Sequence, residues 1–140
     1  MMINLKEYKD QKEILNLLAE CMYSDEKRII QEYEQYKNDK TTILLGSIEN
    51  QELVGLIGIF NTRNEEVEIK HIAIKSGHRR RGLGKKLIRE YIRENQIRRV
   101  EAETDKDAVD FYRRLGFNIT SLGQKYPGVE RFQCSLIIKR

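Results

Sequence analysis

Cysteine, proline and long apolar runs are scarce in this sequence, and each scarcity excludes a class of protein. Two cysteines in 140 residues, Cys21 and Cys134, are too few for a disulfide framework and lack metal-ligand spacing, so we expect reduced core thiols and no metal site. No apolar run approaches the about 20 residues of a membrane span, and the N-terminus lacks the apolar segment of a signal peptide. We therefore expect a cytoplasmic protein with no membrane partner.

The net charge is small, although 34% of the residues are charged. Lys and Arg total 26 against 22 Asp and Glu, which gives a formal charge of +4. This excess is too small for a tail that coats polyanions, so its meaning depends on whether it is dispersed or clustered. The length corresponds to about one domain, and no repeat, low-complexity tract or linker divides residues 1–140.

Two amphipathic helices are expected at the start of the chain, because apolar residues recur at helical spacing within residues 10–23 and 24–39. Asp10 and Ser24 are their candidate N-caps. The segments that follow are rich in apolar and β-branched residues and are separated by turns, which predicts a meander of strands. These strands are expected at residues 41–48, 53–60 and 67–74.

The second half of the chain alternates helical and strand-like patterns. We expect helices at residues 82–95 and 105–115, and strands at 100–104, 117–122 and 131–138. A turn at Pro127, the only proline, joins the last two strands. This order predicts an α+β (mixed α/β) fold with a central mixed, mostly antiparallel sheet of about six or seven strands, flanked by about four helices.

The strand at residues 67–74 changes the phase of its apolar positions. Large apolar side chains occupy odd positions at first, but even positions after His71. A strand with one buried face changes phase only through an extra residue, which predicts a β-bulge near Lys70 and His71. The alternative is a strand whose end is buried on both faces.

A basic, glycine-bearing turn at residues 75–86 follows this strand and opens a helix. Such a turn is an anion site, because the N–H groups of the first helical turn are free and Gly82 and Gly84 allow close approach. The turn contains no acid, and its formal charge exceeds that of the whole chain. It is not a Walker A loop, since Gly77 does not lead to Gly-Lys-Ser/Thr, nor a dinucleotide fingerprint, since Leu87 replaces the third glycine.

The pattern Arg79-x-x-Gly82-x-Gly84, directly behind an apolar strand, resembles the cofactor motif of the GNAT superfamily of acyl-CoA-dependent N-acyltransferases. Residues 103–117 resemble the second motif of that family, in which a helix carrying a tyrosine, here Tyr112, ends at Gly-Phe. The two helices before the first hairpin also match the family's order of elements. The resemblance thus covers nearly the whole chain and suggests a bacterial-type, single-domain member.

The resemblance implies that acetyl-CoA is the co-substrate. The backbone of residues 72–74 would pair with the pantetheine arm, and the N–H groups of about residues 80–85 would hold the pyrophosphate. The cofactor-binding residues implied are Ile72, Ala73, Ile74, Arg79, Arg80, Arg81, Gly82, Leu83, Gly84, Lys85, Asp105 and Tyr112. Asp105 stands where relatives commonly carry Asn.

The resemblance places Tyr112 near the thioester sulfur. A phenol has an ordinary pKa near 10, so it is protonated at pH 7 and can donate a proton to the leaving thiolate. The alternative for Tyr112 is a core tyrosine without a chemical role, because it shares a helical face with Ala108 and Leu115.

The implied reaction is direct attack of a substrate amine on the thioester in a ternary complex, without a covalent enzyme intermediate. The amine must lose a proton, so a base is required. We predict Glu68 as this base, with His71, Glu101 and Glu103 as alternatives. The acceptor is an unidentified primary amine: a polyamine-like molecule, an amino acid derivative, an antibiotic or a protein N-terminus.

Two other functions compete with acetyl transfer. A non-catalytic acyl-CoA-binding module would keep the basic turn without a working Tyr112. A nucleic-acid-binding protein would use the basic run, but this run lacks interleaved aromatic residues and a known binding motif, so we expect no nucleic-acid partner. The chain is expected to be a monomer or a homodimer.

Overall fold

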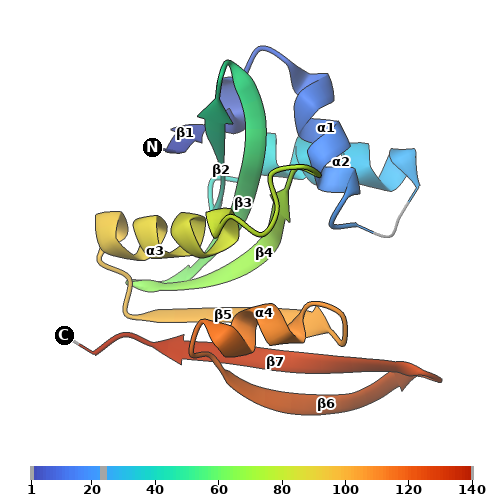
Figure 1. Ribbon diagram of the computed structural model, residues 1–140, viewed down its shortest axis with the longest axis vertical. Helices are drawn as coiled ribbons and strands as arrows, with labels where there is room; N and C mark the ends of the chain where they lie inside the picture. The colour runs from blue at the N-terminus through green and yellow to red at the C-terminus, as the bar shows by residue number, and fades with distance from the viewer. Residues whose placement is uncertain (1, 23–24, 140) are drawn as a thin grey trace.

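The structure is a computed structural model that describes residues 2–22 and 25–139. Seven strands form one sheet in the order β1-β2-β3-β4-β5-β7-β6 (Figure 1). Within the described residues, only β4 and β5 pair in parallel, and the other neighbours are antiparallel. The strands are β1 (Met2–Asn4), β2 (Thr42–Glu49), β3 (Glu52–Arg63), β4 (Glu66–Ile74), β5 (Arg99–Asp105), β6 (Asn118–Tyr126) and β7 (Val129–Ile137). The helices are the 3-10 turn η1 (Leu5–Glu7), α1 (Gln11–Ala19), α2 (Glu26–Asn38), α3 (Leu83–Asn95) and α4 (Val109–Arg114).

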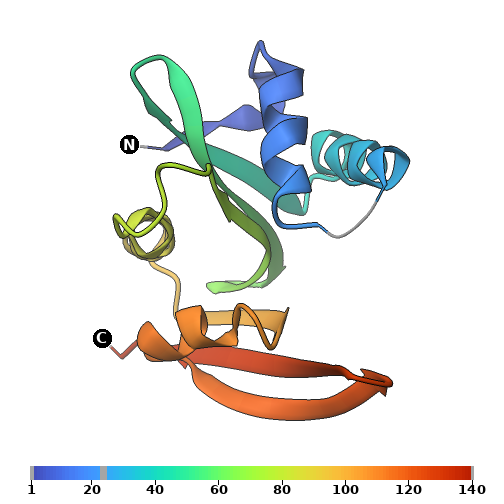
Figure 2. The same ribbon diagram turned by 45° about the vertical axis from the view of Figure 1, so that its right-hand side comes forward.

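This architecture confirms the α+β fold expected from the order of elements. Helices α1 and α2 lie on one face of the sheet and α3 on the other (Figure 2). No helix in the described part of the chain has the length and apolarity needed to cross a membrane. The sequence did not predict β1, because three residues are too short to show an alternating pattern.

The two N-terminal helices differ from the expectation at their ends. Helix α1 begins after Asp10, whose side chain accepts the N–H of Glu13 at 3.2 Å, but it already ends at Ala19. Helix α2 is capped by Asp25, whose side chain accepts the N–H of Arg28 at 2.9 Å. The expected cap Ser24 lies outside the described residues. Both observed caps are short carboxylates that satisfy a free donor of the first turn.

The expected helix at residues 105–115 is shorter in the structure. The side chain of Asp105 accepts the N–H groups of Asp107 and Ala108, both at 3.0 Å, and forms a turn rather than a helical cap. Helix α4 therefore begins only at Val109. This turn carries the chain from the end of β5 back over the sheet.

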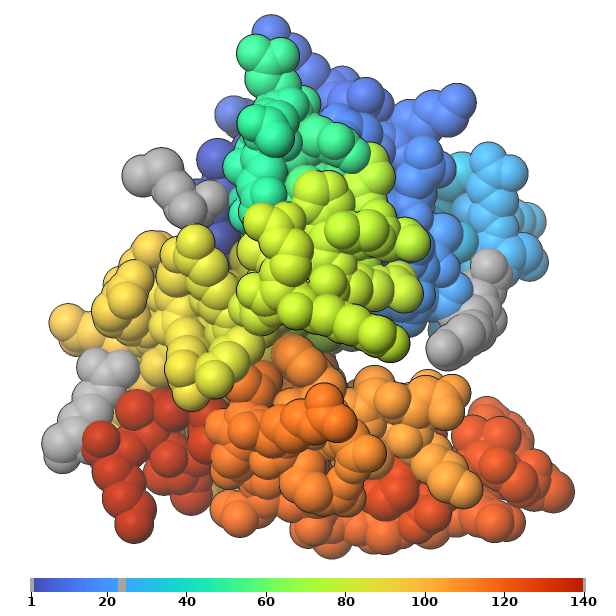
Figure 3. Space-filling view, in the orientation of Figure 1, coloured from blue at the N-terminus to red at the C-terminus, as the bar shows by residue number. Residues whose placement is uncertain are grey.

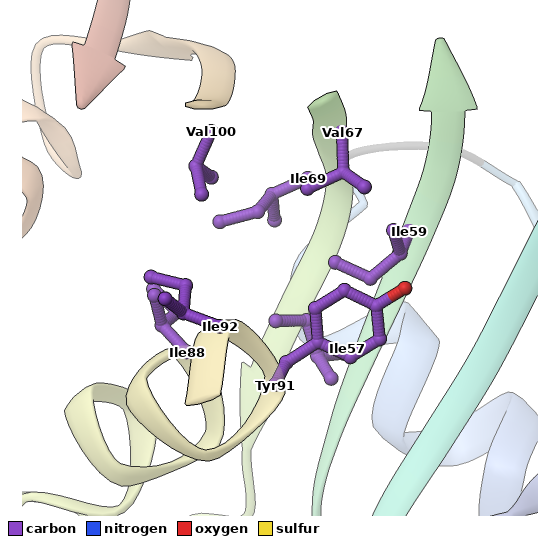
Figure 4. A pocket seen from close by; sticks show the side chains of 8 residues that line it. All are labelled: Ile57, Ile59, Val67, Ile69, Ile88, Tyr91, Ile92 and Val100. Atoms are coloured by element: carbon purple, nitrogen blue, oxygen red, sulfur yellow. The ribbon is translucent and has the colours of Figure 1, made fainter. Parts of the chain in front are cut away.

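Two apolar clusters hold the helices to the sheet, one on each face. Helix α3 packs Ile88, Tyr91 and Ile92 against the side chains of β3, β4 and β5 (Figure 4). The strand residues of this contact are Ile57, Ile59, Val67, Ile69 and Val100. The start of α3 lies next to the end of β4, since a Cβ atom at Gly84 would lie 3.8 Å from the Ile72 side chain.

The structure confirms the bulge in β4. Gly58 of β3 pairs with His71, whereas the next residue, Ile59, pairs with Ile69, so Lys70 is the extra residue. Ile69 before the bulge and Ile72 after it both contribute to the α3 cluster, as the change of phase requires.

Strands β4 and β5 are paired for only part of their lengths. Their register runs from Glu66 opposite Arg99 to Ile69 opposite Ala102, and beyond these residues the two strands diverge (Figure 1). The rest of β4 pairs only with β3, and the rest of β5 only with β7. The bulge lies where the divergence begins, and the sheet is split there into two arms.

Candidate active site

A cleft of about 1120 Å³ lies between the two diverging arms. The space-filling view shows it as a hollow between the segment of β4 with the following loop and the segment of β5 with α4 (Figure 3). Of the residues predicted from the sequence, those that line the cleft are Ile72, Ala73, Ile74, Arg79, Arg80, Gly82, Leu83, Gly84, Lys85, Asp105 and Tyr112. The fold thus brings the two predicted motifs together on opposite walls.

The basic loop gives one wall of the cleft its anion-binding character. Arg80 and Gly82 have positive φ angles of 65° and 75°, and Gly82 is the N-cap of α3 without any side-chain cap bond. The first N–H groups of a helix without a side-chain cap are free to bind an anion, and the helix dipole favours negative charge there. The Arg79 Nε also donates to the carbonyl oxygen of Ile74 at 3.0 Å, which ties the loop to the end of β4.

Carboxylates from other elements partly neutralise this loop. Arg79 forms an ion pair with Glu20 at 3.6 Å, and Lys75 forms one with Glu52. Arg81 turns toward the β2–β3 hairpin, where its Nη1 lies 3.3 Å from Glu49 Oε1. Arg81 is not among the described residues that line the cleft. These are exposed ion pairs, which are weak and can be exchanged for a bound phosphate.

Tyr112 and Phe111 of α4 line the wall of the cleft that lies opposite the basic loop. Tyr112 is only 5% exposed and packs edge-to-face against Phe111 and Phe117, with ring centroids 5.1 and 5.2 Å apart. Burial raises the pKa of Tyr112 well above its ordinary value, and the thiols of Cys134 and Cys21 add to this shift. Tyr112 is therefore both a core residue and part of the cleft lining, so its burial does not by itself decide between the two alternatives from the sequence.

Gly84 allows α3 and α4 to approach each other at the cleft. A Cβ atom at Gly84 would lie 3.0 and 3.1 Å from Cε1 and Cζ of the Phe111 ring. These distances are shorter than ordinary van der Waals contact, so glycine keeps the basic loop close to the helix that carries Tyr112.

The candidate bases lie in different surroundings. Glu103 lines the cleft; burial opposes its ionisation, but hydrogen bonds from Arg131 and Lys125 outweigh burial and hold its pKa below the ordinary value. Glu101 accepts a hydrogen bond from Gln133 at 2.6 Å. Glu103 is thus held in its charged form, which makes it a weak base.

Glu68 and His71 lie on β4, on either side of the bulge. Glu68 is half-buried next to Glu101 in the sheet register and is not among the described residues of the cleft lining. His71 lines the cleft, and burial lowers its pKa below the ordinary value, a shift that Glu32 opposes and Lys70 reinforces. Its Nδ1 lies 2.6 Å from the Tyr36 hydroxyl.

Cys21 differs from the core thiol that the sequence suggested. It follows α1, is half-buried and lines the cleft, whereas Cys134 is fully buried. Burial raises the pKa of Cys21 to about 11, although hydrogen bonds with its own backbone and that of Ile72 act in the opposite direction. No local sequence pattern predicts this position, because it depends on how α1 docks against β4. The described residues contain no group of three or more His, Cys, Asp or Glu side chains that could hold a metal ion.

Comparisons with known proteins agree with this geometry. The family model described as "Acetyltransferase (GNAT) family" matches residues 11–117. The chain is 34% identical over 65 residues to an uncharacterized N-acetyltransferase in the lysA 3′ region of Bacillus methanolicus, a match that covers 46% of this chain and 54% of that protein. The chain thus spans about half the length of this curated relative.

Solved structures show the same fold over the whole chain. An aminoglycoside 6′-N-acetyltransferase complexed with coenzyme A has a TM-score of 0.80 at 17% identity, covering 100% of this chain and 98% of the other. A GNAT family acetyltransferase from Elizabethkingia anophelis with acetyl-CoA bound has a TM-score of 0.76 at 17% identity, covering 99% and 97%. The protein described here belongs to the GNAT family of acetyltransferases, which confirms the resemblance found in the sequence.

Proposed function

We propose that this protein transfers the acetyl group of acetyl-CoA to a primary amine, by direct attack of the amine while both substrates are bound. The observation that carries this proposal is the cleft between β4 and β5, with the basic start of α3 on one wall and the buried Tyr112 on the other. Family membership and the CoA-bound structures of similar fold support the choice of co-substrate.

Acetyl-CoA would lie along the free edge of β4. Among the described residues, no strand pairs with residues 72–74 on the β5 side. Apart from the Ile74 carbonyl, which accepts from Arg79, the backbone groups on this edge can pair with the pantetheine arm as an added strand would. The pyrophosphate would bind the N–H groups of about residues 80–85, with Arg79 and Arg80 adding positive charge. Asp105 would face the cofactor from the opposite wall, with its Oδ1 already held by two backbone N–H groups.

In the reaction, a bond forms between the amine nitrogen and the thioester carbon, and the carbon–sulfur bond breaks. Tyr112 would donate its proton to the departing thiolate, since burial keeps the phenol protonated. The proton lost by the amine would go to a base. Glu68 on β4 is our candidate for this base, because it carries no ion pair or side-chain hydrogen bond among the described residues and lies one residue before Ile69, where the pairing of β4 with β5 ends.

Two measurements test this function. Calorimetric titration with acetyl-CoA should show binding, and its absence would exclude both the enzyme and the non-catalytic module. Release of free CoA should then be followed with a panel containing a polyamine, an aminoglycoside, free amino acids and peptides with a free N-terminus. Binding without turnover of any amine would favour the non-catalytic module over the enzyme.

Direct transfer makes a specific prediction for Cys21, the thiol that lies in the cleft. Because burial raises the pKa of Cys21 to about 11, only a very small fraction is thiolate near neutral pH, and the thiol is a poor nucleophile. We expect Cys21→Ser to change kcat by less than about threefold. Initial-rate measurements should give intersecting double-reciprocal plots. Mass spectrometry that found an acetylated wild-type enzyme, but no acetylated Cys21→Ser variant, would contradict direct transfer.

A further inference from the structure

Strands β3 and β4 and helix α2 meet at the bulge of β4, where β4 and β5 begin to diverge and the cleft opens. The extra residue Lys70 moves His71 to the face of the sheet on which α2 packs. The hydroxyl of Tyr36, from α2, lies 2.6 Å from Nδ1 of His71. Tyr36 is 1% exposed, so this hydrogen bond is shielded from water.

Gly58 of β3 makes room for this contact. It is the residue paired with His71, and a Cβ atom at this position would overlap the hydroxyl oxygen of Tyr36. No other residue type fits there without moving the tyrosine. The hydrogen bond between Tyr36 and His71 therefore requires both the bulge in β4 and the missing side chain at Gly58.

The direction of this hydrogen bond follows from the chemistry of its partners. Burial, together with the nearby acidic groups, raises the pKa of Tyr36 well above its ordinary value, so the phenol keeps its proton. His71 Nδ1 is the hydrogen-bond partner of this hydroxyl within residues 2–22 and 25–139. A buried donor without a partner is costly, so Tyr36 donates and Nδ1 accepts. A neutral imidazole that accepts at Nδ1 carries its hydrogen on Nε2.

His71 in this state has no free lone pair for the proton of an ammonium substrate. The charged groups around it come from two elements: Glu32 of α2, whose Oε1 lies 3.9 Å from His71 Nε2, and Lys70 of β4, which is 3.7 Å from the same oxygen. The Nε2–H group thus faces a carboxylate. Tyr36 thus holds the imidazole at Nδ1, and Glu32 lies near Nε2 without a hydrogen bond to it.

We propose that His71 is a positioning residue for acetyl transfer, which holds the β4 bulge through Tyr36 so that the backbone from Ile72 onward faces the cleft, and that it is not the proton acceptor. This inference rests on the proposed function. It assigns a role to the α2–β4 contact that lies outside the cofactor motifs.

The two nitrogens of His71 can be tested separately. In His71→Asn the amide oxygen can lie near the position of Nδ1 and accept from Tyr36, whereas in His71→Gln the amide lies near the position of Nε2. We expect His71→Asn to keep kcat within about threefold, and His71→Gln and Tyr36→Phe each to lower it about tenfold, the effect of one lost hydrogen bond. The double variant of Tyr36→Phe and His71→Gln should be no slower than either single variant, because both remove the same contact.

A matched control lies one turn earlier on the same helix. Tyr33 is 2% exposed and has no side-chain hydrogen bond among the described residues, so Tyr33→Phe should leave kcat unchanged. The pH profile of kcat/KM, measured with the fastest amine of the panel, should keep its shape in His71→Asn. If both His71 variants lose the acidic limb of this profile while Tyr36→Phe remains active, His71 is the base. That result would overturn the proposal.

A measurement without turnover separates this inference from the proposed function. Long-range 1H–15N correlation spectra of the free protein should show His71 with an unprotonated Nδ1 and a protonated Nε2. The opposite tautomer would overturn the positioning role even in an active enzyme. A wild-type protein that neither binds acetyl-CoA nor releases CoA would instead contradict the proposed function, whatever the tautomer.

Discussion

Replacing Gly84 by leucine is expected to weaken acetyl-CoA binding about a hundredfold. A Cβ atom at this position already lies 3.0 Å from the Phe111 ring, so a longer side chain must push the start of α3 away from α4. The N–H groups of the first turn would then lose their alignment with the pyrophosphate. Loss of two hydrogen bonds to a charged group, at about 1.5–3 kcal/mol each, is sufficient for an effect of this size.

A graded series distinguishes this effect from general loss of structure. Gly84→Ala requires the Phe111 ring to move by only a few tenths of an ångström and should weaken binding only a few-fold. Gly77→Asn is the control in the same loop, because Gly77 has a φ of 92° and a Cβ atom there would meet no atom of the described residues within 4 Å. Asparagine also tolerates positive φ. Titration calorimetry, together with thermal unfolding of each variant, measures the series. Equal affinities for glycine, alanine and leucine at position 84 would show that this loop does not hold the cofactor.

The sequence predicts best the features that are fixed by local pattern. The bulge is one of them, because a strand with one buried face cannot shift its apolar phase without an extra residue, and Lys70 is that residue. The start of α3 is another, since Gly82 and the basic loop determine where the helix can begin. Both features agree with the structure because each depends on residues that are close together in the sequence.

Features that depend on how elements dock could not be predicted in the same way. Nothing local to β4 or β5 shows that their pairing ends at Ile69 and Ala102, because the divergence depends on β3 and β7 pairing with the remaining lengths. The hydrogen bond from Tyr36 to His71 depends equally on the docking of α2. One local sign of it exists: Gly58 interrupts an apolar strand, and a glycine inside a strand often marks the close approach of another group.

Tyr112→Phe is expected to lower kcat about a hundredfold or more while leaving the affinity for acetyl-CoA within about twofold, since general acids contribute about 10²–10⁴-fold to rates. The ring contacts with Phe111 and Phe117 remain in the variant, and the lost hydroxyl has no hydrogen-bond partner among the described residues. The fold should therefore be unaffected, and the loss should appear in CoA release rather than in binding.

The pH dependence and a matched variant sharpen this prediction for Tyr112. Burial raises the pKa of Tyr112 above the ordinary value near 10, so the phenol stays protonated. Deprotonation of Tyr112 should therefore not lower the wild-type kcat at any pH below about 10. Tyr91 is the control: it is 5% exposed, lies in the same apolar cluster and does not line the cleft, so Tyr91→Phe should keep full activity. If kcat is equal in the Tyr112→Phe and Tyr91→Phe variants, the thiolate leaves without a proton from Tyr112. The buried phenol of Tyr112 would then only line the cleft, without a role in proton transfer.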